Sequence, residues 1–334
     1  MEQHGRLDLI ISRLPGLKPK DRVRLCEKID SEDDFIRFTK SDIENILGRA
    51  LKYFWDIDAI RAMADHDAKV CRMRSINHVS WRSAAYPPMV REIYDPPAVL
   101  FYRGQLPPAD KPLLGMVGTR RPSRAALSQA YSLARDLGSL GVSVVSGLAL
   151  GIDAISHRGN LEGGSPTFAV LGSGVDEVYP SSNRPLANRI LDTGGAILSE
   201  YPVGTVPHKW HFPARNRIVC ALSRSVLIVE APARSGALIT AELALDYGKD
   251  LWVASSGIYA EENPLYDRRG TIKLAQDGAE IIFHPADVLE KWGVEIAHNS
   301  ETPCKKIISR EISSGNAGGK ALAASLAEYL DIDL

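Results

Sequence analysis

The stretch Gly115-Met-Val-Gly-Thr-Arg-Arg-Pro-Ser-Arg124 decides how the rest of the chain is organised. The apolar run from Leu113 to Val117 predicts a buried strand that stops at Gly118. Three arginines and no acidic residue follow, and then an amphipathic helix begins. The first N–H groups of a helix have no intrahelical partner, so such a turn can bind an anion. The stretch alone leaves two interpretations open: a phosphate site, or an ordinary strand–helix turn with solvated arginines.

The composition narrows the class of protein. The chain has 334 residues, 45% hydrophobic and 24% charged, which is typical of a globular protein with two or more domains. Its net charge of −1 means that nucleic-acid binding would need a local basic patch. Four cysteines without a Cys-x-x-Cys pair argue against a zinc or disulfide framework. With no spanning run or signal-peptide pattern, we expect a cytoplasmic protein without metal, cofactor or membrane.

Residues 1–72 predict a small all-helical domain of four helices, because apolar residues recur there at helical spacing. Ser41 and Glu44 form a capping-box pattern that should start the third helix. The turn Leu14-Pro-Gly-Leu17 resembles a helix-hairpin-helix, which can hold a nucleic-acid backbone. The nearly balanced charge of the segment favours the alternative, an interaction domain of the sterile-alpha-motif (SAM) type.

Two further segments flank the central part of the chain. Residues 73–112 are rich in proline and predict a linker that becomes an entry strand, Ala98 to Tyr102. Residues 293–334 predict a flexible polar tail with one possible short helix, Ala321 to Leu330. We recognise no C-terminal winged helix in this tail.

Residues 113–292 alternate apolar runs with amphipathic segments. The expected strands are Leu113–Val117, Val142–Ser146, Thr167–Leu171, Ala196–Glu200, Ser225–Glu230, Leu251–Ala254 and Ala279–Phe283. Continuously apolar strands that alternate with amphipathic helices predict an α/β fold with an extended, doubly wound, mainly parallel Rossmann-like sheet. Ligands of such a sheet bind at the carboxyl ends of its strands.

Short segments that follow four predicted strands combine small residues with cations or hydroxyl groups. These segments begin at Gly118, Ser146, Gly172 and Arg234. After the second strand, the glycine spacing lets the backbone approach a ligand closely, and the helix that follows favours an anion. Asp153 is expected to cap that helix.

The 29 residues from Tyr201 to Val229 contain no acid. They hold cations interleaved with ring side chains: Lys209, Arg215, Arg217 and Arg224 with His208, Trp210, His211 and Phe212. Such a mixture suits a single-stranded nucleic acid, because cations follow the phosphates and rings accept stacked bases. The alternative is a core helix whose two arginines bond to backbone carbonyls.

Six blocks together resemble the DNA processing protein A (DprA/Smf) family. They are Gly118-Thr-Arg120, Ser146-Gly-Leu-Ala-Leu-Gly-Ile-Asp153, Leu171-Gly-Ser-Gly-Val-Asp-Glu-Val-Tyr-Pro180, Ser199-Glu-Tyr201, Phe212-Pro-Ala-Arg-Asn-Arg-Ile218 and Ser235-Gly-Ala-Leu-Ile-Thr-Ala-Glu242. The resemblance implies a Rossmann domain that binds and protects incoming single-stranded DNA, forms a homodimer, and loads the RecA recombinase during natural transformation. It implies a protein that is not an enzyme.

The same resemblance implies a DNA-binding site. Arg120 would contact a phosphate, Arg215 and Arg217 would belong to the pocket, and Lys209 would add a basic contact. Backbone donors would come from Ser146, Gly147 and Gly151. The candidate site also includes Gly118, Thr119, Arg121, Asn216, Ser235 and Gly236. No acidic residue of the ribose-binding kind follows the second strand, so a strand of DNA fits better than a dinucleotide.

Two alternatives remain open. One is a nucleotide phosphoribohydrolase-like enzyme, whose Pro-Gly-Gly-x-Gly-Thr-x-x-Glu motif would fall near Glu242. Leu238 and Ile239 stand where that motif has a glycine and the threonine, which disfavours the enzyme. The other is an interaction module that binds a nucleotide only for structural reasons.

Overall fold

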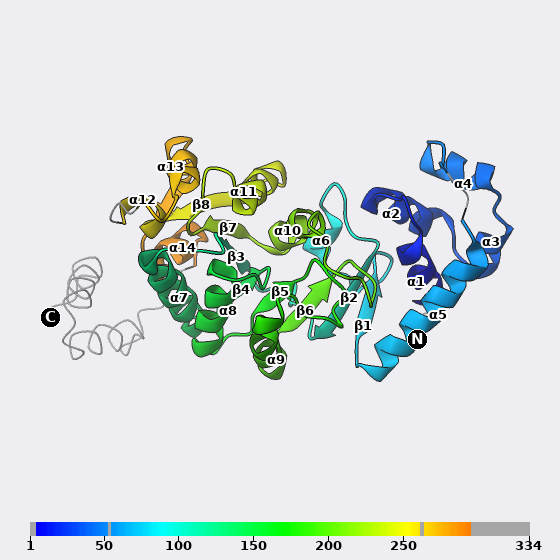
Figure 1. Cartoon of the computed structure of the whole chain (residues 1–334), viewed down its shortest axis with the longest axis horizontal. Coiled ribbons are helices and arrows are strands. Elements are labelled where there is room, and N and C mark those ends of the chain that lie inside the picture. The colour runs from blue at the N-terminus through cyan, green and yellow to red at the C-terminus, as the bar shows by residue number, and fades with distance from the viewer. Residues whose placement is uncertain (1–4, 53–54, 261–263, 295–334) are drawn as a thin grey trace. The chain divides into compact units, whose positions relative to one another are not determined.

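The computed structural model describes residues 5–52, 55–260 and 264–294 (Figure 1). The chain divides into two compact units, and the second begins at His284. Within the described residues, that second unit contains the helix α14 (Pro285–Lys291). The helix predicted at residues 321–330 and the expected lack of a winged helix both lie outside the described residues.

The N-terminal part is helical, as predicted, but it has one more helix than expected. Its helices are α1 (Gly5–Arg13), α2 (Pro19–Lys28), α3 (Glu32–Arg37), α4 (Lys40–Leu47) and α5 (Ile57–Met73). The capping box of α4 is formed by Thr39 and Asp42, so the prediction of Ser41 and Glu44 is wrong. Both pairs have the same spacing, but the Glu44 carboxylate instead accepts a hydrogen bond from Leu51 N at 2.7 Å.

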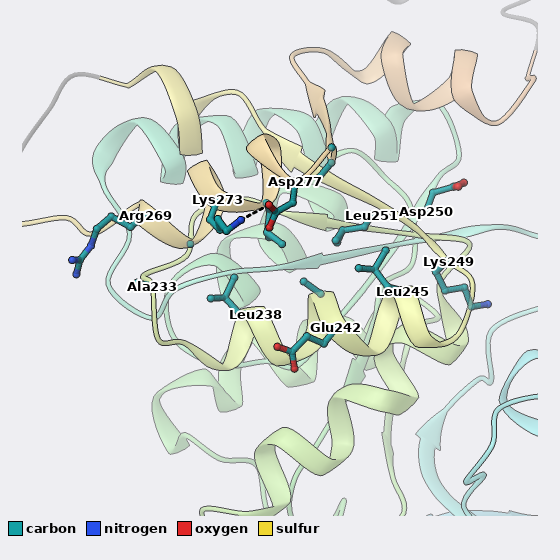
Figure 2. A pocket seen from close by; sticks show the side chains of 15 residues that line it. Ala233, Leu238, Glu242, Leu245, Lys249, Asp250, Leu251, Arg269, Lys273 and Asp277 are labelled. Carbon is teal, nitrogen blue, oxygen red and sulfur yellow. Dashed lines mark hydrogen bonds and ion pairs between the residues drawn. The ribbon is translucent and has the colours of Figure 1, made fainter.

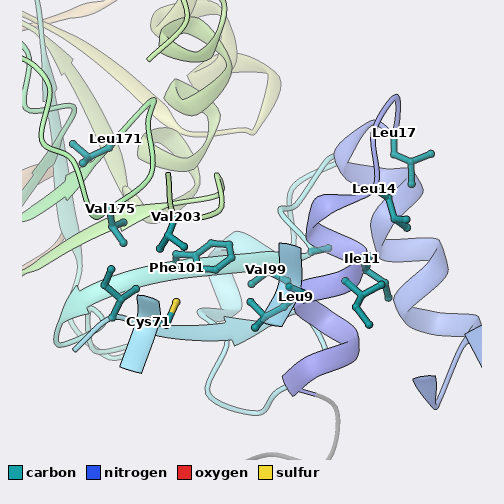
Figure 3. Packing of buried hydrophobic residues seen from close by; sticks show 14 of the residues in the cluster. Leu9, Ile11, Leu14, Leu17, Cys71, Val99, Phe101, Leu171, Val175 and Val203 are labelled. Carbon is teal, nitrogen blue, oxygen red and sulfur yellow. The ribbon is translucent and has the colours of Figure 1, made fainter. Parts of the chain in front are cut away.

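These helices share a hydrophobic core with one end of the sheet. Leu9 and Ile11 of α1 belong to the same buried cluster as Val99 and Phe101 of the strand β2 (Val99–Gly104) (Figure 3). Arg13 on α1 donates to the buried Asp67 carboxylate at 2.6 Å and to Val203 O at 2.7 Å. Arg13 therefore links the N-terminal helices α1 and α5 to the loop that follows β6.

The sheet has nine strands among the described residues, in the order β1-β2-β6-β5-β4-β3-β7-β8-β9. Besides β2, they are β1 (Asn77–Ser80), β3 (Leu113–Val117), β4 (Ser143–Ser146), β5 (Phe168–Val170), β6 (Ala196–Ser199), β7 (Ser225–Ile228), β8 (Asp250–Ala254) and β9 (Glu280–Ile282). From β6 to β9 all neighbours are parallel. The predicted doubly wound, mainly parallel α/β sheet is confirmed.

Helices cover both faces of this sheet (Figure 1). One side carries α7 (Arg124–Ser139), α8 (Ile152–Glu162) and α9 (Arg184–Asp192); the other carries α10 (His211–Leu222), α11 (Gly236–Asp246) and α13 (Arg269–Gln276). Two short helices, α6 (Pro88–Arg91) and α12 (Ser256–Tyr259), complete the unit. The strand order reverses between β3 and β7, so a ligand is expected near the carboxyl ends of the strands at this point of the sheet.

The proline-rich segment 73–112 contributes two strands, where the sequence predicted one. β1 pairs with β2, and β2 pairs antiparallel with β6, so both extend the parallel sheet. Prolines of this segment lie before β2, where Tyr86 Oη donates to Pro97 O at 2.6 Å, and after it, at Pro107, Pro108 and Pro112. β2 itself contains no proline, so its N–H groups can donate to the neighbouring strands of the sheet.

The helices α7 and α8 pack closely because α8 carries glycines at the contact. A Cβ atom at Gly159 would lie 2.4 Å from Tyr131 O, which is closer than real Cβ atoms come. The neighbouring Asn160 amide donates to Ala134 O at 3.1 Å and accepts from Val144 N at 3.0 Å. The amide therefore pins both helices to the strand that leads into the ligand crevice.

We expect Gly159→Ala to lower the free energy of unfolding by about 1–3 kcal/mol, because the added methyl group pushes against a backbone carbonyl. Gly236→Ala is the matched control, since nothing lies within 4 Å of its added Cβ. The control should be neutral or stabilising by up to about 1 kcal/mol. Urea denaturation of both variants measures the difference, and equal midpoints would contradict the packing argument.

Candidate nucleic-acid interface

The N-terminus of α7 is closed by a carboxylate from the protein itself. Ser123 caps the helix, its N–H donates to Glu230 Oε1 at 2.9 Å, and its hydroxyl donates to Glu230 Oε2 at 2.6 Å. Glu230 follows β7 and is 1% exposed. A buried carboxylate therefore occupies the place where a bound phosphate would sit in a dinucleotide fold. The carboxylate favours the second interpretation of this turn, an ordinary strand–helix turn, over the phosphate site.

A small pocket opens beside this closed turn, at the carboxyl ends of β3, β4 and β5. It is lined by Arg120, Gly147, Ala149, Leu150, Tyr179, Pro180, Phe212 and Arg215. Three of the residues predicted for the site therefore meet in one place, although they come from different parts of the chain. The loops after β3 and β4 and the start of α10 supply them.

The mouth of the pocket combines a cation with two rings. The Arg120 guanidinium lies over the Phe212 ring, 5.4 Å from its centroid. The Tyr179 ring is 5.5 Å from the Phe212 ring and 47% exposed. The guanidinium is thus placed by cation–π attraction while its outer side faces solvent. A phosphate and a base can both find partners within this group.

Arg215 approaches the same pocket from below. It is 5% exposed, it donates to Val170 O at 3.0 Å, and its Nη2 lies 3.6 Å from Asp153 Oδ2. Gly147 makes this position possible, because a Cβ atom there would overlap the guanidinium. Burial lowers the pKa of Arg215 and raises the pKa of Asp153, while the attraction between the two charges opposes both shifts.

Asp153 folds the loop after β4 and does not cap α8. The N-cap of α8 is Gly151, and Asp153 Oδ2 accepts from Gly147 N at 3.2 Å and from Ala149 N at 3.4 Å. The predictions of Asp153 as a cap and of Gly147 as a free backbone donor are therefore wrong. The carboxylate of Asp153, two positions into the helix, thus satisfies two N–H donors of the loop that precedes it.

The other two residues expected to supply backbone donors have structural contacts. Ser146 is fully buried in β4, and its hydroxyl donates to Met116 O at 2.6 Å. Gly151 has a φ of +78°, and a Cβ atom there would lie 2.4 Å from Thr119 O. This glycine lets the loops after β3 and β4 pack against each other.

Arg217 points away from the pocket and into a buried ion-pair cluster. It is 4% exposed, it forms a two-pronged pair with Glu200 that includes an Nη2–Oε2 distance of 2.7 Å, and its Nε donates to Asp95 O at 3.0 Å. Residues two apart on a helix face different directions, so Arg215 and Arg217 cannot both line one pocket. The assignment of Arg217 to the DNA pocket is wrong, and the alternative of a structural arginine holds for it.

The remaining predicted residues are not among those that line the pocket, and they differ in exposure. Arg121 and Lys209 are exposed, and Gly118 and Thr119 are half-buried. Asn216 is half-buried, and its amide donates to Thr240 Oγ1 at 2.8 Å. Ser235 and Gly236 begin α11, with Gly236 exposed.

Neither Tyr179 nor Phe212 was assigned to the predicted pocket, although Phe212 belongs to the acid-free stretch whose rings were expected to accept stacked bases. Phe212 stands in the same block as Arg215, and Tyr179 follows the glycines after β5. The spacing of both residues from Arg120 is long, so only the fold brings them together. Both residues belong to blocks that follow predicted strands, and this position was the sequence signal for a place in the site.

A second concave surface lies between α11 and α13, as a groove of about 620 Å³ (Figure 2). Leu238, Glu242 and Leu245 of α11 line one wall, and Lys273 of α13 lies on the other, paired with Asp277. Leu245 is 61% exposed, so this groove presents apolar side chains to solvent. Its character differs from that of the cationic pocket.

Metal chemistry and membrane insertion find no support in the part of the chain that the structure describes. No cluster of three or more His, Cys, Asp or Glu side chains there could hold a metal ion. No described helix has both the length and the apolar character needed to cross a bilayer.

Comparison with known proteins decides the family. A family model described as DNA recombination-mediator protein A matches residues 77–293. The chain belongs to the DNA recombination-mediator protein A family. The DNA processing protein DprA of Bacillus subtilis is 38% identical over 223 residues, which cover 66% of this chain and 72% of that protein. The Smf protein of a Synechocystis strain is 41% identical over 212 residues, 62% of this chain and 52% of that relative.

Solved structures agree with this family membership. DNA processing protein A of Streptococcus pneumoniae superposes with a TM-score of 0.69 at 30% identity, covering 87% of this chain and 99% of that one. DNA processing protein A of Helicobacter pylori superposes with a TM-score of 0.57 at 32% identity, covering 65% and 95%. The latter structure is described as revealing a single-stranded DNA binding mode of the Helicobacter protein. The resemblance drawn from the six blocks is confirmed.

We expect Arg217→Ala to lower the free energy of unfolding by about 3–5 kcal/mol, because it leaves the Glu200 carboxylate, whose side chain is only 12% exposed, without the cation of its ion pair. Arg120→Ala, at an exposed position, should change the same quantity by less than about 0.5 kcal/mol. Chemical denaturation measures both variants. An Arg217→Ala variant as stable as the parent would return Arg217 to the list of possible DNA contacts.

Proposed function

We propose that this chain is a recombination mediator that binds and protects single-stranded DNA at the carboxyl edge of its sheet, and loads RecA onto it during natural transformation. The observation that carries the proposal is the Arg120 guanidinium held over Phe212 at the mouth of the pocket, with Tyr179 beside it. A cation next to exposed rings matches the two chemical parts of an unpaired strand.

The proposed contacts differ in kind. Arg120, Arg121 and Lys209 follow the phosphates, and Tyr179 and Phe212 contact bases. Arg215 lines the pocket from its buried position, where Asp153 compensates its charge. Gly118, Thr119, Gly151, Asn216, Ser235 and Gly236 are proposed as the surrounding wall, with the buried Ser146 as its support. Contacts with phosphates and ring faces carry little sequence information, so weak base preference is expected.

The proposed protein partners are a second copy of this chain and RecA. Family membership supports both. The groove between α11 and α13 suits a protein better than DNA, because its exposed Leu245 and half-buried Leu238 offer apolar contact area (Figure 2). This separation would let one face bind DNA while another binds protein.

The enzyme alternative loses support from the position of Glu242. This carboxylate lines the groove between α11 and α13, whereas Arg120 and Arg215 line the pocket beside β3 and β4. A nucleotide glycosidase would need its carboxylate and arginine at one substrate. Incubation with nucleoside monophosphates, followed by chromatography for free base, tests for this activity, and release of base would contradict the proposal.

We expect Arg120→Ala and Lys209→Ala each to weaken oligonucleotide binding about fivefold at 0.1 M salt, equally for dT and dA strands. Each loss should also reduce the slope of log affinity against log salt by about 0.7, because one phosphate contact is removed. Fluorescence anisotropy across a salt series measures both quantities. Arg158→Ala is the matched control, since Arg158 is an exposed arginine on α8.

Unchanged curves for both variants would overturn the site. A nucleotide-binding module gives a different result, because a ligand stabilises only the state that binds it. Thermal stabilisation by a mononucleotide but not by an oligonucleotide would favour the module. Stabilisation that grows with oligonucleotide length supports the proposed function.

A further inference from the structure

A pair of stacked rings stands at the surface just before α10. The rings of His208 and Trp210 are 4.7 Å apart and inclined by 3°, so they are almost parallel. Trp210 is 68% exposed, which is unusual for the largest apolar side chain. Neither residue lines the pocket of Arg120. A flat aromatic surface of this kind needs a reason to face solvent.

The stack is held in place by a second pair of rings beneath it. The edge of His211 meets both rings at 84°, 5.0 Å from the His208 ring and 6.0 Å from the Trp210 ring. His211 is itself stacked on Tyr201 at 3.9 Å. The surface pair is therefore arranged before any ligand arrives.

The backbone anchors the bracing ring. His211 Nδ1 lies 3.0 Å from Gly172 O, which follows β5, so this nitrogen carries the proton that it donates. Burial lowers the pKa of His211, which keeps the ring neutral near neutral pH. A neutral ring held by this hydrogen bond has one orientation, and its contacts with His208 and Trp210 fix the orientation of those two rings.

The chemistry around the stack points to a nucleobase. Lys209 lies between the two ring residues and is exposed, and no acid occurs from Tyr201 to Val229. A base needs an open ring face, and the phosphate attached to its sugar needs a nearby cation. An apolar protein partner would have no use for the lysine. The combination fits one nucleotide of an unpaired strand.

We propose that the His208–Trp210 stack is a second base-stacking position, separate from the Arg120–Phe212 pocket. The proposal rests on the proposed function and adds a residue role to it: Trp210 contacts a base, His208 extends the ring surface, and His211 and Tyr201 position them. Because the rings are already ordered, stacking costs little side-chain entropy. The strand would thus be held at two points on this side of the sheet.

Replacing Trp210 tests the stacking directly. Trp210→Ala should weaken binding of a dT oligonucleotide by about fivefold to a hundredfold, the range found for base–aromatic contacts. Trp210→Phe keeps a ring and should recover most of that loss. Tyr259→Ala is the matched control, because Tyr259 is an exposed ring, 65% exposed, on α12. Trp210 is exposed, so we expect the parent's unfolding midpoint in all three variants.

An abasic strand separates base stacking from charge. The parent protein should bind an abasic phosphodiester of equal length more weakly than dT, and Trp210→Ala should show a smaller difference between these two strands. DNA should also quench tryptophan fluorescence in the parent and much less in Trp210→Ala, since Trp55, Trp252 and Trp292 are 8%, 3% and 4% exposed and Trp81 is half-buried.

Two results have different meanings. If the parent binds dT and Trp210→Ala binds it equally well, or if both lose the same factor on the abasic strand, the stacking position is overturned while the proposed function stands. If the parent binds no single-stranded DNA at all, the proposed function itself fails.

Discussion

The buried pair of Arg215 and Asp153 holds the functional edge of the sheet together. Asp153 accepts hydrogen bonds from the loop after β4, and Arg215 donates to Val170 O at the end of β5. The ion pair between them, at 3.6 Å, joins α8 to α10 across two strand ends. Both charges are almost fully buried, so each depends on the other for compensation. Tyr179, Phe212 and Arg120 lie on or beside the segments that this ion pair connects.

The glycines at this edge of the sheet are needed for packing within the protein itself. Gly147 leaves room for the Arg215 guanidinium, and Gly151 leaves room for the backbone after β3. In a dinucleotide-binding fold, comparable glycines let a pyrophosphate approach a helix N-terminus. Here the N-terminus of α7 is already bound to Glu230. The same kind of sequence signal therefore has a different physical cause in this chain.

The sequence was a good guide wherever local pattern decides structure. The bounds predicted for β3 match those observed, because a continuous apolar run needs no tertiary information. It was a poor guide where partners are distant: the Glu200 and Asp95 that bury Arg217 lie 17 and 122 residues away. For the same reason the sequence did not show that Tyr179, Phe212 and Arg120 lie together. It also did not show that the Gly147 N–H group is bound by Asp153.

The pocket offers a cation and rings beside a loop in which the N–H groups of Gly147 and Ala149 are bound to Asp153, and binding through side chains favours a polymer over a small ligand. Backbone N–H groups at a helix end hold one phosphate in one geometry. Long cations and exposed rings instead accept phosphates and bases in several arrangements, and each contact is modest in energy. Useful affinity then requires several nucleotides bound in sequence. The closed turn at Glu230, the cation over Phe212 and the exposed rings before α10 are thus consistent with one another: they suit a strand that passes along the sheet edge.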